Sequence, residues 1–430
     1  MDDTIYFGFG ITSTSINSDV QNNFSWRTLG PGILLASAAI GGSHLISSTQ
    51  AGATYGWQLA GLIIITNLLK YPFFRFGTDY VYGTGESLIA GYYKKSKVYL
   101  GVYLFLSMFA SVVGTGAVAL LCAAILGFML PASLELSTIT LSVIVMGISW
   151  VFLVAGHYKL LDSVNKWIII ALTFGSLVAV IMAAGKPTVM TADFVATSPW
   201  NLATLGFLVA LMGWMPAPME FSAINSMWIS AKIKAENTTH RQGLIDFNVG
   251  YSVSTVLALV FLALGVFVQY GSGQEIQTAG SDYVGQLINM YTATIGEWSK
   301  FLVAFVAFMC MFGTTLTSAD GTARANSECL RLFKGNKEIT NKQIFFWTTY
   351  AIVGGLIIII FFTGQLGSRL KFAMIAAFIA APIVGGLNYV LIKDHKKLST
   401  VMNIWAIVGL IFLTGIALLF IANLLGFFTV

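Results

Sequence analysis

Long apolar segments alternate with short polar ones along almost the whole chain. Eleven of these segments approach the length of about 20 residues that a helix needs to cross a bilayer. They cover residues 29–55, 57–77, 99–129, 136–156, 165–184, 202–229, 248–270, 299–322, 343–363, 371–392 and 403–428. The pattern predicts an all-α integral membrane protein with eleven transmembrane helices.

The composition supports this prediction. Of the 430 residues, 57% are hydrophobic and only 10% are charged, whereas about a quarter of the residues in soluble domains are charged. Residues 1–28 are polar, without the apolar core of a signal peptide, and we expect them to form a cytoplasmic N-terminal tail. The sequence contains no nucleophile–base constellation or cofactor loop, so we expect neither an enzyme nor a bound cofactor.

Basic residues are distributed unequally over the predicted loops. If the N-terminus is cytoplasmic, 18 Lys and Arg side chains lie on the cytoplasmic side and four lie outside, with Lys70 inside a span. Cytoplasmic loops of membrane proteins carry such an excess. We therefore expect a cytoplasmic N-terminus and an external C-terminus, and we attribute the net charge of +5 to topology and membrane lipid, not to nucleic acid. The oligomeric state stays open.

Two predicted spans are interrupted in the middle. The first contains Gly-Gly-Ser-His at residues 41–44, and the sixth contains Met-Pro-Ala-Pro at residues 215–218. A break at bilayer depth frees backbone groups, which are tolerated mainly where they line a cavity or a substrate path. The alternative is that the glycines serve close helix packing and the prolines produce a modest kink.

The positions of the breaks predict internal symmetry. They fall in the first and sixth spans, where a five-helix unit (29–184) and an inverted copy of it (202–392) would begin, with residues 403–430 as an eleventh helix. Paired breaks of this kind indicate a transporter's binding site. We expect the substrate to contact Gly41, Gly42, Ser43, His44, Met215, Pro216 and Ala217.

Ionisable and hydroxyl side chains inside the spans are further candidates. An ionised side chain at mid-helix costs about 2.5–3.5 kcal/mol on insertion scales, so it is usually paired or faces water. We expect Lys70 to pair with Glu220 or Asp320, either as a structural ion pair or as part of a proton site. The eighth span adds a hydroxyl-rich run with Thr314, Thr315, Thr317 and Ser318.

His44 differs from the other three histidines, which fall in predicted cytoplasmic loops. Polar groups at bilayer depth are usually functional, so we favour a binding or gating role for His44 over a helix–helix hydrogen bond. The three cysteines show neither metal-ligand spacing nor the pattern of a disulfide framework.

Several motifs resemble those of the natural resistance-associated macrophage protein (NRAMP) family of divalent-metal transporters. They lie at residues 30–32 (Gly-Pro-Gly), 50–53 (Gln-Ala-Gly-Ala), 83–88 (Gly-Thr-Gly-Glu-Ser-Leu) and 215–216 (Met-Pro). The resemblance implies the LeuT-type fold of the amino acid-polyamine-organocation (APC) superfamily, with unwound helices 1 and 6. It also implies secondary active transport by alternating access. In that fold, hydroxyls of helix eight that face carbonyls of helix one can bind Na⁺, so Na⁺ and H⁺ are both coupling candidates.

The expected site departs from the family. Members that carry manganese or iron have Asp-Pro-Gly-Asn where this chain has residues 41–44, and Met-Pro-His where it has residues 215–217. Hard divalent ions normally need a carboxylate ligand, so His44 and Met215 remain as ligands better suited to a softer metal. We expect either divalent-metal transport through this altered site or proton- or sodium-coupled transport of a small organic solute. A non-transporting membrane sensor is a second alternative.

Overall fold

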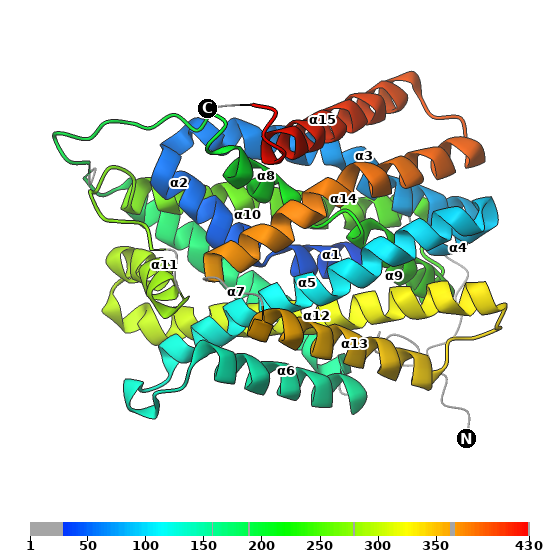
Figure 1. Cartoon of the computed structure of the whole chain (residues 1–430), viewed down its shortest axis with the longest axis horizontal. Coiled ribbons are helices and arrows are strands. Elements are labelled where there is room, and N and C mark those ends of the chain that lie inside the picture. Colours follow the sequence, from blue (N-terminus) through cyan, green and yellow to red (C-terminus); the bar gives the residue numbers. More distant parts are fainter. Residues whose placement is uncertain (1–28, 157, 188–189, 278–279, 362–365, 429–430) are drawn as a thin grey trace.

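The computed structural model describes residues 29–156, 158–187, 190–277, 280–361 and 366–428. Within these ranges the regular secondary structure is entirely helical, and most of the long helices run side by side along the longest axis of the molecule (Figure 1). The predicted tail, residues 1–28, lies outside the described residues.

Helices occupy all eleven predicted ranges. The first range contains α1 (Pro31–Ala39), η2 (Ser43–Ser48) and α2 (Thr49–Tyr55), and the sixth contains α8 (Leu205–Gly213) and α9 (Phe221–Glu236). The others contain α3 (Ala60–Thr84), α5 (Lys97–Met129), α6 (Thr138–Val154), α7 (Tyr158–Ala184), α10 (His240–Val268), α12 (Lys300–Lys334), α13 (Asn341–Phe361), α14 (Leu366–His395) and α15 (Thr400–Leu424). Outside these ranges lie α4 (Leu88–Lys95), η4 (Ala132–Leu134) and α11 (Gly280–Ile295), and two short helices, η3 (Gly56–Leu59) and η5 (Glu297–Ser299), lie at the start of the second and eighth ranges.

Helix ends differ from the predicted span ends because a helix continues past its apolar segment. The helix predicted to end at residue 77 ends at Thr84, and the one predicted to end at residue 322 ends at Lys334. In the described part of the chain, seven helical stretches are long and apolar enough to cross a membrane. One of them, Ser43–Thr84, joins the first two predicted spans across Gly56, whose φ is +60°.

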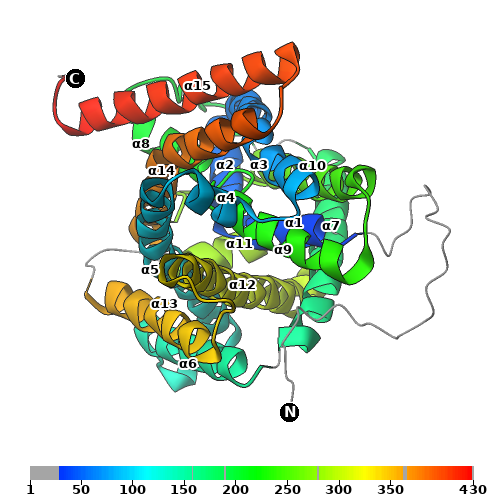
Figure 2. The same ribbon diagram turned by 90° about the vertical axis from the view of Figure 1, so that its right-hand side faces the viewer.

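The short helix α1 lies in the interior, against α10, α12 and α9 (Figure 2). Its N-terminal residues are fixed to α10, because the Asp246 carboxylate accepts hydrogen bonds from the backbone N–H groups of Gly30 and Gly32, each at 2.8 Å. The two backbones also touch: a Cβ on Gly250 would lie 1.9 Å from the carbonyl oxygen of Gly32. Only glycine permits this approach.

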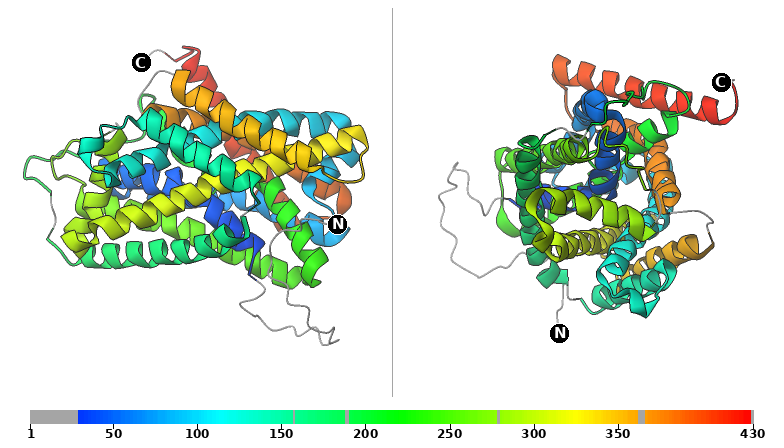
Figure 3. Two further views of the ribbon diagram at one scale, coloured as in Figure 1. Left: turned by 90° about the horizontal axis from the view of Figure 1, so that it is seen from below. Right: turned by 90° about the vertical axis from the view of Figure 1, so that its left-hand side faces the viewer.

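The outer helices expose large apolar side chains. Helices α6 and α13 form one side of the bundle and α15 forms the opposite side (Figures 1 and 3). Exposed apolar residues on these helices include Val143, Ile148, Val353, Ile357, Ile411 and Leu418. Apolar surfaces of this extent favour lipid over water, so the structure agrees with a multi-pass integral membrane protein.

One buried carboxylate brings basic residues together at one end of the bundle. Asp79 of α3 contacts Arg75 at 3.5 Å, His240 of α10 at 2.8 Å and Lys396 at 3.2 Å. All three basic residues belong to segments that the sequence predicts to lie on one side of the membrane. The contact therefore supports placing these loops on the same side.

Candidate functional site

The first break separates α1 from η2. Helix α1 ends at Ala39, Ile40 leaves the helical conformation (φ −74°, ψ 88°), and the chain continues in a π-helical turn from Ser43. Side chains from other segments pack closely against the two glycines, Gly41 and Gly42. A Cβ would lie 3.4 Å from Thr314 if built on Gly41, and 3.3 Å from the Trp214 ring if built on Gly42.

The second break separates α8 from α9 and leaves residues 214–220 without regular helix. Lys70 of α3 satisfies the backbone there, because its ammonium donates to the carbonyl oxygens of Met212 at 2.7 Å and Gly213 at 3.0 Å. Helix α14 packs directly on the end of α8, where a Cβ on Gly213 would lie 2.0 Å from the carbonyl oxygen of Met374. The freed carbonyls of this break are thus bound by a cation of the chain itself.

Among the described residues, no salt bridge or hydrogen bond joins Lys70 to Glu220 or Asp320, although the charges of Lys70 and Glu220 interact through space. Lys70 contacts carbonyl groups instead of Glu220 or Asp320, and Asp320 accepts a hydrogen bond from Arg324 on the same helix at 2.7 Å. The prediction of a direct pair considered only charged side chains as partners for Lys70. A helix break at bilayer depth frees carbonyls that need a donor as much as a charge needs a partner.

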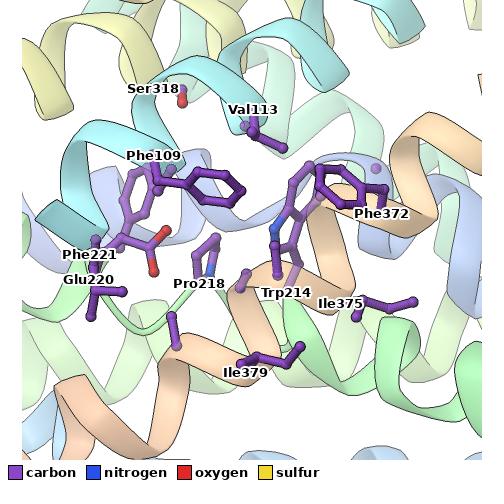
Figure 4. A pocket seen from close by; sticks show the side chains of 18 of the residues that line it. Phe109, Val113, Trp214, Pro218, Glu220, Phe221, Ser318, Phe372, Ile375 and Ile379 are labelled. Atoms are coloured by element: carbon purple, nitrogen blue, oxygen red, sulfur yellow. The ribbon is translucent and has the colours of Figure 1, made fainter. Parts of the chain in front are cut away.

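A cavity of about 670 Å³ lies beside the two breaks (Figure 4). Trp214 and Phe221 border it from the second break, Phe109 from α5 and Phe372 from α14, and most of the remaining lining is apolar. Ser318, Thr314 and Thr322 of α12 add hydroxyl groups.

Glu220 is the acidic side chain in the cavity wall. It is only 4% exposed, and its carboxylate points towards Phe109 and Pro218 (Figure 4). Its Oε2 atom has no hydrogen-bond partner among the described residues. A buried carboxylate without such a partner is energetically costly unless a cation approaches it.

The structure brings only some of the predicted site residues together. Five of them border the cavity: Gly41, Gly42, Glu220, Thr314 and Ser318. The others are buried outside its lining: Ser43, His44, Met215, Pro216, Ala217, Lys70, Thr315, Thr317 and Asp320.

His44 faces α10 instead of the cavity. Its Nε2 atom lies 2.9 Å from the carbonyl oxygen and 3.1 Å from the hydroxyl of Ser254, and its Nδ1 atom lies 2.9 Å from the Ser43 hydroxyl. Met215 points elsewhere, into an apolar cluster with Leu59 and Leu262. Within the described ranges, no group of three or more His, Cys, Asp or Glu residues is arranged to hold a metal ion.

Thr314 is the hydroxyl residue that joins α12 to the first break. Its Oγ1 atom donates to the carbonyl of Cys310 at 2.9 Å and lies 3.4 Å from the carbonyl oxygen of Ile40 and 3.5 Å from that of Ser37. Thr315 donates to its own helix, at Met311, at 2.8 Å.

Sequence reasoning missed the aromatic walls. Trp214 had a usable signal, since it directly precedes the Met-Pro motif of the second break. Phe109 and Phe372 had none, because they come from different helices that meet only in the fold. Their ring centroids lie 6.4 Å apart in an edge-to-face arrangement.

The chain is similar in sequence to a known protein family and similar in fold to solved structures. The family model described as "Natural resistance-associated macrophage protein-like" matches residues 32–425. An uncharacterized protein of Pasteurella multocida (strain Pm70) is 52% identical over 421 residues, which is 96% of each chain.

Solved structures of the Eremococcus coleocola manganese transporter share the fold. A glutamate-to-glutamine mutant has a TM-score of 0.69 at 14% identity, covering 96% of this chain and 91% of that one. A histidine-to-alanine mutant has a TM-score of 0.67 at 15% identity, covering 92% and 87%.

Proposed function

The chain belongs to the natural resistance-associated macrophage protein-like family, and from this premise we propose that it is a secondary active transporter that carries a cation through the cavity beside its two helix breaks. The family consists of transporters, not enzymes. The observation that carries the proposal is Glu220, a buried carboxylate aimed into that cavity. A cation in the cavity would supply the partner that this carboxylate lacks among the described residues.

Two classes of cation are candidates. Family membership and the manganese transporters of the same fold support a metal ion. The apolar and aromatic walls around Glu220 favour an organic cation instead.

The proposed architecture comprises eleven membrane-spanning helices in a LeuT-type fold. The first five-helix unit covers residues 29–184, its inverted copy covers residues 202–392, and the segment 403–430 contributes the eleventh helix, α15 (Thr400–Leu424). Helices in all eleven predicted ranges and breaks at the start of both units support this. The N-terminus is cytoplasmic and the C-terminus external.

Alternating access would use the breaks as hinges. Lys70 holds the end of α8, and Asp246 holds the start of α1 against α10. Between these fixed points, η2 with α2 on one side and α9 on the other are separate helical bodies. Their movement about the breaks would open the cavity to one side of the membrane at a time.

Coupling to a sodium gradient is the first coupling mode to test. The Thr314 Oγ1 atom lies 3.4 Å from the carbonyl oxygen of Ile40 and 3.5 Å from that of Ser37, and oxygen groups of this kind suit Na⁺. Uptake should fall when choline replaces sodium. Equal uptake in both salts would exclude coupling to sodium. A proton gradient would then be the remaining candidate, with Glu220 as the proton-carrying group.

Uptake into proteoliposomes tests the function itself. The wild-type protein should accumulate at least one cation from a panel of manganese, iron, magnesium and organic ammonium ions. Glu220→Gln should reduce that uptake at least about tenfold, because it removes the charge and keeps the shape. Absence of uptake for the whole panel, or full uptake by Glu220→Gln, would contradict the proposal.

A further inference from the structure

We infer that the cavity binds an organic ammonium ion with an apolar body, not a metal ion. The inference rests on the proposed function in one respect, namely that the cavity is the substrate site. It adds the chemical class of the substrate and assigns the roles of Glu220 and of the aromatic wall.

Glu220 is the buried charge of the cavity, whereas Lys371, which also borders it, is exposed. Glu220 is 4% exposed and has an oxygen without a hydrogen-bond partner in the described structure. The buried cation of the break, Lys70, donates to the carbonyls of Met212 and Gly213; its charge interacts with that of Glu220, but no hydrogen bond or salt bridge joins the two side chains. A bound ammonium group would donate to the carboxylate in a charge-assisted hydrogen bond.

The mostly apolar lining of the cavity suits the apolar part of an organic ammonium ion. Phe109 lies beside the carboxylate, and Trp214 lies across Pro218 from it, next to Phe372 (Figure 4). Aromatic faces attract ammonium groups, most strongly where water is excluded. The cavity volume of about 670 Å³ falls within the range of about 300–1,000 Å³ typical of small-molecule sites. A metal ion with six waters needs only about 180 Å³, counting about 30 Å³ for each water.

The freed carbonyls, His44 and Met215, which could bind a metal ion, already contact other groups of the protein. Lys70 already binds the two carbonyls freed at the end of α8. Both ring nitrogens of His44 contact serine groups, and Met215 lies in an apolar cluster. One carboxylate and a few hydroxyls remain, which is a poor set for stripping water from a divalent ion.

Calorimetry on the purified full chain in detergent tests the inference with a matched pair of probes. Phenethylammonium and 2-phenylethanol have nearly the same shape but differ in charge, and Mn²⁺ serves as the metal probe. Phenethylammonium should bind at least tenfold more tightly than the alcohol and than Mn²⁺. Glu220→Gln should remove the preference for the amine while leaving binding of the alcohol within about twofold.

Two further variants distinguish a specific loss of amine binding from a general loss of folded protein. Trp214→Leu should weaken amine binding about tenfold, because it removes the best cation–π partner. Glu86→Gln, which alters an exposed carboxylate paired with Lys94, should change nothing. If Glu220→Gln does not fold, the amine–alcohol comparison on the wild type and Trp214→Leu still decide the matter.

The outcomes distinguish this inference from the proposed function. Mn²⁺ binding that depends on Glu220, with no preference for the amine over the alcohol, overturns the inference and leaves cation transport intact. Amine binding without uptake of any cation into proteoliposomes supports the site but contradicts transport. Absence of binding by every probe overturns the inference.

Discussion

The two helix breaks interrupt the first and the sixth predicted spans, but they present different groups to the cavity. The first contributes bare glycines to the cavity, while its polar side chains Ser43 and His44 turn to α10. The second presents Trp214 and Glu220 to the cavity. The first break leaves room in the cavity because glycine has no side chain, and the second supplies an aromatic ring and a carboxylate that can bind a substrate.

The backbone of each break is also stabilised differently. At the second break, Lys70 donates to freed carbonyls from a neighbouring helix. At the first, the chain re-enters helix within a few residues and the Thr314 hydroxyl approaches the Ile40 carbonyl. A break that is several residues long needs an outside donor, because its own turns cannot satisfy its carbonyls at bilayer depth.

The largest expected effect comes from removing that donor. Lys70→Met keeps the apolar stem but leaves the carbonyls of Met212 and Gly213 without the ammonium, which should destabilise the protein by about 3 kcal/mol. Thermal unfolding in detergent measures this loss. Lys97→Met, at an exposed lysine, is the matched control, and equal melting temperatures for the two variants would contradict the role of Lys70.

A graded glycine series compares how tightly each break is packed. A Cβ would lie 2.0 Å from a backbone oxygen at Gly213, 3.3 Å from a ring carbon at Gly42 and 3.4 Å from a methyl carbon at Gly41. Gly213→Ala should therefore cost about 1–3 kcal/mol, Gly42→Ala less, and Gly41→Ala close to nothing. A Gly213→Ala variant that melts no lower than Gly41→Ala would show that α14 does not fix the second break.

His44 tests whether the polar groups of the first break are structural. His44→Ala removes contacts to Ser254 and Ser43 and should cost about 1–2 kcal/mol of stability. Binding of phenethylammonium should stay within about twofold of wild type, because the ring does not border the cavity. A loss of binding without a loss of stability would instead assign His44 to the site.

Among the polar residues, the smallest expected effect on stability is at Thr314. Thr314→Val should cost less than about 0.6 kcal/mol but should abolish the difference between uptake in sodium and in choline. Thr315→Val is the control on the same helix, since that hydroxyl bonds to Met311. Unchanged sodium dependence in Thr314→Val would remove this residue from the coupling site.

Much of the fold was accessible from the sequence. Apolar length predicted where helices lie, because a bilayer sets the length of a spanning segment, and the double proline and double glycine predicted both breaks, because these residues interrupt helices. Glu220, Thr314 and Ser318 were named from their polarity within apolar spans, and all three border the cavity.

The direction of each side chain was not accessible in this way. Over the few residues of a break the helical period is lost, so the facing of Ser43, His44 and Met215 could not be read from spacing. The partner of Lys70 and the aromatic wall formed by Phe109 and Phe372 depend on contacts between helices far apart in the chain.

The sequence by itself determined that this chain is a bundle of membrane helices with two breaks, because hydropathy and backbone chemistry are local properties. Only the tertiary structure decided which groups face the cavity. Packing turned His44 and Met215 away, assigned Lys70 to the carbonyls of the second break, and left Glu220 among aromatic rings.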